Sequence, residues 1–169
     1  MLLCHAMSGV TCADFIAECR RAGWGVPIAN VSFVGSNSLL QRLRTLSADS
    51  SQDLTMNLLN SQVVPSSTDP TYPLVQNFNT VFAKSKDPQP VALEGWLNAV
   101  VTTEALRRAG PNLNRTAFVT AMESLGGWDP GIGTPLGFSP TSHLGLSKVW
   151  LERTEGGRWV TETKELASR

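Results

Sequence analysis

Residues 26–46 read VPIANVSFVGSNSLLQRLRTL, and this stretch decides the fold class. Its first part, 26–34, is apolar and β-branched, which predicts a strand that ends at Gly35. Ser36 is then predicted to cap a helix. The apolar stripe of that helix recurs at helical spacing and comprises Leu39, Leu40, Leu43 and Leu46. A strand followed after a short loop by an amphipathic helix is typical of α/β folds.

The same alternation appears on both sides of this stretch. Residues 2–6 form a short apolar run, which predicts a strand, and Met7 to Val10 are expected to turn. Thr11 and Asp14 have the form of a capping box, which predicts a helix from Thr11 to about Ala22 that stops at Gly23. Its predicted buried face comprises Phe15, Ile16, Cys19 and Ala22. A third apolar run, 54–64, completes the pattern of a three-layer α/β/α lobe with a mainly parallel sheet.

The second half of the chain predicts three helices and a hairpin. One helix starts at Thr71, with a predicted buried face of Leu74, Val75, Phe78, Val81 and Phe82. The longest covers 91–110, between Pro90 and the stop Gly110-Pro111, and another begins at Asn112 or Asn114 to bury Phe118, Met122 and Leu125. Residues 128–145 are rich in Gly and Pro and are expected to be irregular, and 148–163 read as a β-hairpin. We therefore expect one partial domain, 1–169, composed of a lobe (1–127) and a Gly/Pro-rich segment with a C-terminal hairpin (128–169).

Composition narrows the function. The chain has 169 residues, of which 41% are hydrophobic and 17% charged, with 14 basic and 14 acidic side chains. This neutral balance without a basic stripe argues against nucleic-acid binding. No apolar run approaches the roughly 20 residues of a membrane span, and Met1 to Cys4 are too short for a secretory signal.

Motifs for catalysis, cofactors and metals are absent from the sequence. It contains no GxGxxG, Walker, GxSxG or HExxH pattern, and the cysteines Cys4, Cys12 and Cys19 lack metal-ligand spacing. Cys12 and Cys19 would lie about 10 Å apart along one helix, so buried thiols without a mutual disulfide are expected. Asp129, in the sequence WDPG, is expected to form a turn. An enzyme that uses Glu94 with His143 remains an alternative, but no cofactor or metal is predicted.

Several blocks, in order along the chain, resemble one family. They are Arg20–Trp24 (RRAGW), Val26–Ser36, Gln62–Pro65 (QVVP), Leu93–Trp96 with Glu104–Pro111, and Phe138–Gly145 (FSPTSHLG). Together they are similar to the type I periplasmic binding proteins of the branched-chain amino-acid (Leu/Ile/Val) transport group. That resemblance implies two α/β lobes that close on a ligand. This chain corresponds to the second lobe and the C-terminal hairpin, so the first lobe is expected as a missing partner.

The resemblance also implies a ligand site where strands end and helices begin. On this chain the corresponding residues are Ser8 and Gly9 in the first loop, Ser32, Phe33 and Gly35 in the second, and Glu94 near the start of the long helix. The expected ligand is an amino acid or small carboxylate, and the expected partner is a membrane permease. The location implied for the full-length protein is extracytoplasmic, periplasmic or on the cell surface.

A second kind of protein could contain such a lobe, and this alternative stays open. Similar lobes form the extracellular sensing domain of some membrane receptors, including kinetoplastid receptor-type adenylate cyclases, where a receptor transmembrane region replaces the permease. Two glycosylation-type triplets, Asn30-Val31-Ser32 and Asn114-Arg115-Thr116, are compatible with that setting.

Overall fold

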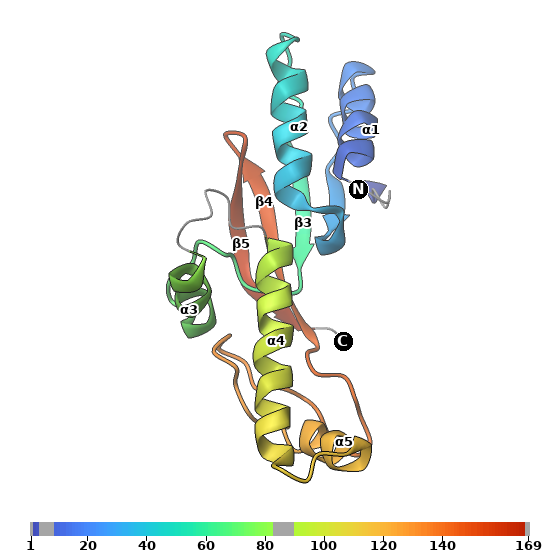
Figure 1. Cartoon of the computed structure of the whole chain (residues 1–169). Coiled ribbons are helices and arrows are strands. Elements are labelled where there is room, and N and C mark those ends of the chain that lie inside the picture. Colours follow the sequence, from blue (N-terminus) through green and yellow to red (C-terminus); the bar gives the residue numbers. More distant parts are fainter. Residues whose placement is uncertain (1, 4–8, 83–89, 168–169) are drawn as a thin grey trace. The chain divides into compact units, whose positions relative to one another are not determined.

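The computed structural model describes the backbone of residues 2–3, 9–82 and 90–167, and the chain folds into strands and helices of an α/β protein (Figure 1). In chain order these are β1 (Leu2–Leu3), α1 (Gly9–Arg21), β2 (Ile28–Val31), the 3-10 helix η1 (Ser32–Val34), α2 (Ser36–Ala48), β3 (Leu58–Gln62), α3 (Pro73–Val81), α4 (Pro90–Ala109), α5 (Arg115–Glu123), β4 (Lys148–Glu155) and β5 (Arg158–Ala167). They belong to two compact units, one with residues 1–66, 89–91 and 149–166, the other with 67–88, 92–148 and 167–169.

The first unit is built on one five-stranded sheet in the order β1-β2-β3-β4-β5. β1, β2 and β3 are parallel, with Ile28 opposite Leu58 and Asn30 opposite Asn60. β4 is antiparallel to β3. The C-terminal hairpin, β4 and β5, thus adds to the β3 side of the parallel strands. The predicted α/β class and hairpin are confirmed, and the hairpin extends the same sheet.

The core of the first unit lies between this sheet and the helices α1 and α2, which run side by side (Figure 1). Its buried members are Cys12, Ala13, Ile16, Ala17 and Cys19 from α1, Leu39 and Leu43 from α2, and Ile28, Val34, Leu54 and Leu58. Trp159 of β5 packs against the same cluster, so the hairpin contributes to this core. Cys12 and Cys19 are free, buried thiols, as predicted, and Cys4 lies outside the described residues.

Three local predictions for the first unit are wrong. α1 begins at Gly9, so Thr11 and Asp14 lie within the helix and form no capping box at its start. Phe15 is 45% exposed and Ala22 is exposed as well, because the buried face of α1 follows Cys12, Ile16 and Cys19. β2 is shorter than the predicted 26–34, since the backbone turns into η1 after Val31.

The start of α2 also differs from the prediction. Gly35, in the left-handed region at φ 79°, occupies the capping position, and Ser36 is the first helical residue. A residue without a β-carbon adopts this conformation without strain, which explains why the chain reverses direction here. Ser36 is therefore free to direct its side chain into the interior, where it is 2% exposed.

The second unit contains α3, α5 and nearly all of α4. α3 and α4 pack through an aromatic cluster, in which the ring centroid of Phe78 lies 4.7 Å from that of Phe82 and 6.4 Å from that of Trp96. Val81 and Phe82 are nevertheless 62% and 42% exposed, so the predicted buried face of α3 was too wide. Asn114 caps α5 by accepting a hydrogen bond from the amide of Ala117 at 3.0 Å, as one of the two predicted starts requires.

The Gly/Pro-rich segment after α5 has no helix or strand, as predicted, but it has specific hydrogen bonds. Asp129 accepts bonds from the amides of Gly131 and Ile132, both at 2.8 Å, which confirms its predicted role as a turn former. Gly131 in turn accepts a bond from the amide of Leu74, at 3.0 Å, at the start of α3. An added β-carbon at Gly131 would lie 2.8 Å from that same amide nitrogen, so glycine is required at this approach.

Candidate ligand site at the carboxyl ends of the parallel strands

The predicted site residues of the first unit follow the strands β1 and β2. Gly9 begins α1 after β1, Ser32 and Phe33 lie in η1 directly after β2, and Gly35 precedes α2. Because parallel strands point the same way, these residues gather at one edge of the sheet, where open α/β folds bind ligands. Ser8 lies outside the described residues.

Gly9 lies close to the backbone of the second loop. A β-carbon built on Gly9 would lie 2.9 Å from the carbonyl oxygen of Val34, 3.1 Å from that of Gly35 and 3.0 Å from the amide nitrogen of Leu39. Real β-carbons do not approach backbone atoms so closely, hence only glycine permits this packing. The structure therefore brings Gly9 and Gly35 together.

Apolar side chains are exposed after each of the three parallel strands. Phe33 is 59% exposed, Val10 in the first turn of α1 is 51% exposed, and Val63, directly after β3, is 36% exposed. A phenylalanine that follows a buried strand would ordinarily be expected inside. The carboxyl edge of the sheet thus presents both glycine loops and apolar surface.

Beneath these loops, the sheet carries buried polar residues that the sequence analysis missed. Asn30, Asn60 and Glu152 face one another across β2, β3 and β4 in the strand register, and they are 3%, 0% and 7% exposed. Gln62, two residues after Asn60 and on the same face, is 2% exposed. Their signal in the sequence is an amide side chain on the inward-facing positions of short strands, one in IANV and two in LLNSQ.

One side-chain amide links this polar row to α2. Nε2 of Gln62 donates to Oε2 of Glu152 at 3.0 Å and to Oγ of Ser36 at 2.9 Å. Burial raises the pKa of the Glu152 carboxyl, and the neighbouring side-chain amides of Gln62 and Asn60 act in the opposite direction. The amide group of Asn30 has no hydrogen-bond partner among the described residues. Asn30 is thus too buried to be a glycosylation acceptor in the folded chain.

Glu94, the remaining predicted site residue, lies on α4 in the second unit and is half-buried. The helix begins at Pro90, so Glu94 falls just beyond its first turn. Its predicted contact with a ligand stays a prediction.

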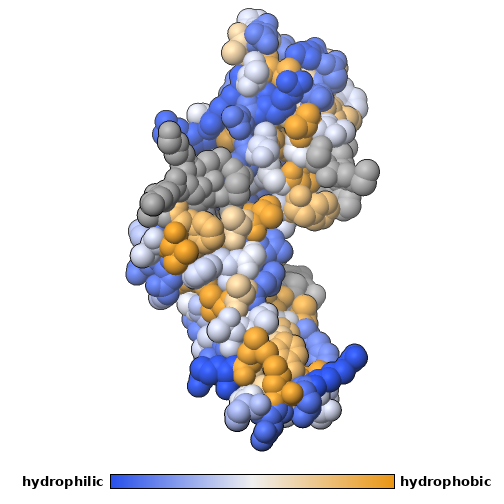
Figure 2. All heavy atoms as spheres, in the orientation of Figure 1, coloured by the Kyte–Doolittle hydropathy of each residue, from blue (hydrophilic) through white to orange (hydrophobic). Residues whose placement is uncertain are grey.

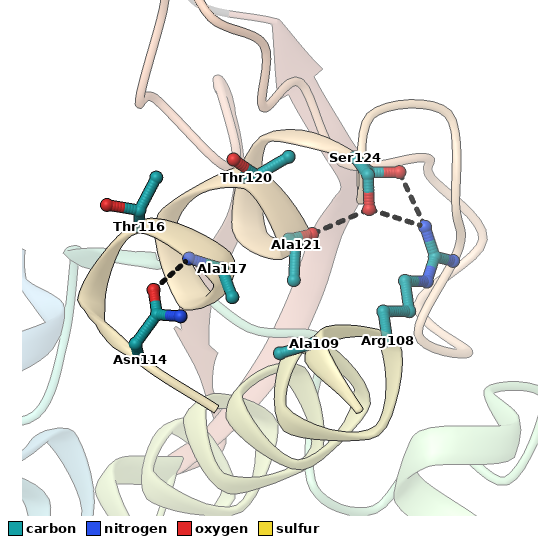
Figure 3. A pocket seen from close by; sticks show the side chains of 8 residues that line it. All are labelled: Arg108, Ala109, Asn114, Thr116, Ala117, Thr120, Ala121 and Ser124. Atoms are coloured by element: carbon teal, nitrogen blue, oxygen red, sulfur yellow. Dashed lines mark hydrogen bonds between the residues drawn. The ribbon is translucent and has the colours of Figure 1, made fainter. Parts of the chain in front are cut away.

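The second unit has a cavity of its own, of about 690 Å³, between α4 and α5 (Figure 3). Small side chains line it, including Ala109, Ala117 and Ala121, and Arg108 bounds it by donating to the carbonyl oxygen and the hydroxyl of Ser124. Figure 2 shows apolar surface where Figure 1 draws these two helices. None of the predicted site residues lines this cavity.

Two further observations bear on chemistry. Nε2 of His143 lies 3.0 Å from Oε1 of Glu123, which gives this histidine an acidic neighbour that the sequence did not indicate. Within the described parts of the chain, no three His, Cys, Asp or Glu side chains converge as a metal site, and no helix has the length and hydropathy needed to cross a membrane.

These features define the class as an α/β lobe whose loops and exposed apolar groups collect at the carboxyl edge of a parallel sheet. A family model described as periplasmic binding protein matches residues 2–158. The chain belongs to the periplasmic binding protein family, and the predicted resemblance is confirmed.

Solved structures agree. A possible leucine/isoleucine/valine-binding protein from Rhodopirellula baltica SH 1 superposes with a TM-score of 0.78 at 26% identity, over 90% of this chain and 40% of that one. A substrate-binding periplasmic protein from Ralstonia solanacearum gives 0.72 at 26% identity, over 89% and 42%. A branched chain amino acid ABC transporter from Thermus thermophilus with bound valine gives 0.67 at 17% identity, over 92% and 43%, and supports the fold alone. No curated protein matches the sequence. The chain spans about 40% of the length of these structures.

Proposed function

We propose that this chain is a ligand-binding lobe of an ABC-type solute-binding protein, and that it binds an amino acid or small carboxylate without catalysis. The observation that carries the proposal is the cluster at the carboxyl edge, where Gly9 meets Gly35 and Phe33 is 59% exposed. A tightly packed loop with exposed apolar groups suits a small ligand that has an apolar side chain.

One lobe supplies only part of the contacts that such a ligand needs. The proposal therefore includes a first lobe that faces this edge, with Ser8, Ser32 and Glu94 as further ligand-facing residues. It treats residues 1–169 as one partial domain, with a membrane permease as partner and an extracytoplasmic location for the whole protein. Sensing by a membrane receptor would use the same site, and the gene separates the two: an adjoining permease favours transport, and a following membrane span and cyclase domain favour the receptor.

The test is a chimera that joins this chain to the first lobe of the Rhodopirellula baltica relative. Calorimetry with leucine, isoleucine, valine and small dicarboxylates is expected to detect binding to the chimera and little binding to the isolated chain. Equal affinity in both forms, or no binding in either, would overturn the proposal.

A matched pair of variants locates the site. Phe33→Ala is expected to weaken ligand binding by the chimera about tenfold, because it removes apolar contact area at the carboxyl edge. Trp24→Ala serves as the control, since Trp24 is similarly exposed (56% against 59% for Phe33) but follows α1 at the opposite edge of the sheet. Equal weakening by both variants would contradict the assigned location.

A further inference from the structure

The first turn of α2 is held from the C-terminal hairpin. The indole Nε1 of Trp159, on β5, donates to the carbonyl oxygen of Ser36 at 3.0 Å. The hydroxyl of Ser36 accepts from Nε2 of Gln62 at 2.9 Å. One residue is therefore fixed through both its backbone and its side chain by groups far away in sequence.

The start of α2 lacks an ordinary side-chain cap. Gly35 occupies the capping position of α2 and supplies no side-chain hydrogen bond to the helix. Caps usually come from Ser, Thr, Asp or Asn at that position, and they hold the first turn in place. Here the side chains of Gln62 and Trp159 constrain the turn instead.

Gln62 is itself held by Glu152 of β4. It is 2% exposed, and the amide that bonds Ser36 also donates to Oε2 of Glu152 at 3.0 Å. Since that donor group serves two acceptors, the orientation of Gln62 is defined by a residue on β4 and one on α2. Glu152, Gln62 and Ser36 therefore form a continuous hydrogen-bond network that runs from the hairpin to α2.

Ser36, at the end of this hydrogen-bond network, directly follows the proposed ligand loop. Gly35 precedes Ser36 directly, its amide donates to the carbonyl oxygen of Ser32 at 3.2 Å, and its own carbonyl accepts from the amide of Leu39 at 3.0 Å. A shift of Ser36 therefore moves the backbone that defines the loop. Gly9 packs closely against the backbone of Val34 and Gly35 in the same loop. The loop backbone is therefore restrained by Gly9 as well as by Ser36.

We propose that Gln62 and Trp159, with Glu152 behind Gln62, are positioning residues that hold the loop Ser32–Gly35 in its ligand-binding conformation. The inference rests on the proposed function of that loop. It assigns a role in binding to the C-terminal hairpin, which lies more than a hundred residues beyond the loop and contributes none of the predicted contacts. Ligand affinity should then depend on side chains that never touch the ligand.

The first arm of the test needs no ligand. Amide hydrogen exchange is measured on the full chain with Trp159→Phe, which keeps an aromatic ring in the core but removes the donor, and with Gln62→Met, which keeps the volume but removes the amide. Each is expected to raise exchange about tenfold at the amides of residues 35–39 and to leave the second half of α2 unchanged. Val160→Ala, at the neighbouring exposed position, is the control and should change neither region.

The second arm measures ligand affinity in the chimera described above. Trp159→Phe and Gln62→Met are expected to weaken binding about tenfold, chiefly through faster dissociation, whereas Glu152→Gln keeps an acceptor for Gln62 and should change affinity less than threefold. Uniform acceleration of exchange throughout the first unit, or an unchanged loop, would overturn the inference. If the chimera binds no ligand while the loop exchanges faster, the proposed function fails and the positioning of the loop stands.

Discussion

Buried polar side chains near the two ends of the same sheet have different surroundings. At the amino edge, Arg20 is 5% exposed and its two terminal nitrogens donate to the carbonyl oxygens of Trp24, Val26 and Met56. Its Nε has no partner among the described residues. In the sheet beneath the carboxyl-edge loops, the amide of Asn30 is as deeply buried but has no partner among the described residues.

The amino edge is thus held by one buried cation, whereas the unpartnered amide lies beneath the proposed ligand loops. A buried polar group without a partner lowers stability, so such groups are uncommon in natural folds. At the amino edge, the Arg20 guanidinium bridges two loops. At the other edge, the glycine loops and exposed Phe33 lie above the buried, unpartnered amide of Asn30. The following variants measure that contrast in free energy of unfolding.

Arg20→Ala should have the largest effect. It removes the donor for three backbone carbonyls at once, so we expect a loss of about 3 kcal/mol in the free energy of unfolding, measured by urea titration. Burial lowers the pKa of Arg20, yet a guanidinium remains charged at any working pH.

The control for this variant is the neighbouring arginine. Arg21 is exposed and pairs with Glu18 at 2.6 Å on the helix surface, so Arg21→Ala should cost at most about 0.5 kcal/mol. Similar losses at the two positions would mean that the amino edge does not depend on the buried cation.

Gly9→Ala tests the carboxyl edge and should cost about 2 kcal/mol, since backbone atoms of Val34 and Leu39 must move to admit a methyl group. Gly25→Ala, at the amino edge, meets no atom within 4 Å and should change stability by less than about 0.5 kcal/mol. Thermal unfolding of the two variants compares them directly. A tolerated Gly9→Ala would show that the helix and loop are not in tight contact.

Asn57 should give a smaller effect at the amino edge. It has φ 52°, and its side chain donates to the carbonyl oxygen of Gly25 at 3.0 Å. Asn57→Ala is expected to cost about 1 kcal/mol, because alanine loses the bond and is strained in the left-handed region. Asn57→Gly should cost less, as it relieves the backbone, and the reverse order in urea unfolding would contradict this account.

The sequence predicted the class of fold because helical and strand periodicities are local. The leucine stripe of α2, the stop at Gly23 and the turn at Asp129 all follow from residues a few positions apart. Boundaries failed where tertiary contacts decide them. Gly9 starts a helix because it fits against Val34 and Gly35, and Val31 ends β2 although the apolar run continues to Val34.

The candidate site was only partly predictable for the same reason. Loops after strands can be found by position, which is how Gly9, Ser32, Phe33 and Gly35 were identified. The support beneath them cannot, since Gln62 reaches Ser36 and Glu152 only through strand pairing between distant segments. An amide in a strand sequence does not reveal which residue it will face.

The last and smallest effect is on the pH dependence of the free energy of unfolding, and it concerns the carboxyl group of Glu152. Because burial raises the pKa of Glu152 above its ordinary value of 4.5, the folded chain holds this proton more tightly than the unfolded chain. The stabilising contribution is complete below pH 4.5 and is lost as the pH rises through the folded-state pKa. Glu152→Gln removes this titration, so its stability relative to the parent chain should increase with pH across that window.

Glu104, on α4, provides a control of opposite sign. Hydrogen bonds from Arg107 and Arg108 lower the pKa of Glu104 to about 2, so its contribution is present above pH 4.5 and disappears as the pH falls toward 2. Urea unfolding from pH 3 to 8 should therefore give difference curves that bend in opposite directions, with Glu104→Gln costing stability at neutral pH. If Glu152→Gln instead ran parallel to the parent chain, the carboxylate would not be desolvated. The contrast between the two edges would then rest on the bonds of Arg20 and the unpartnered amide of Asn30.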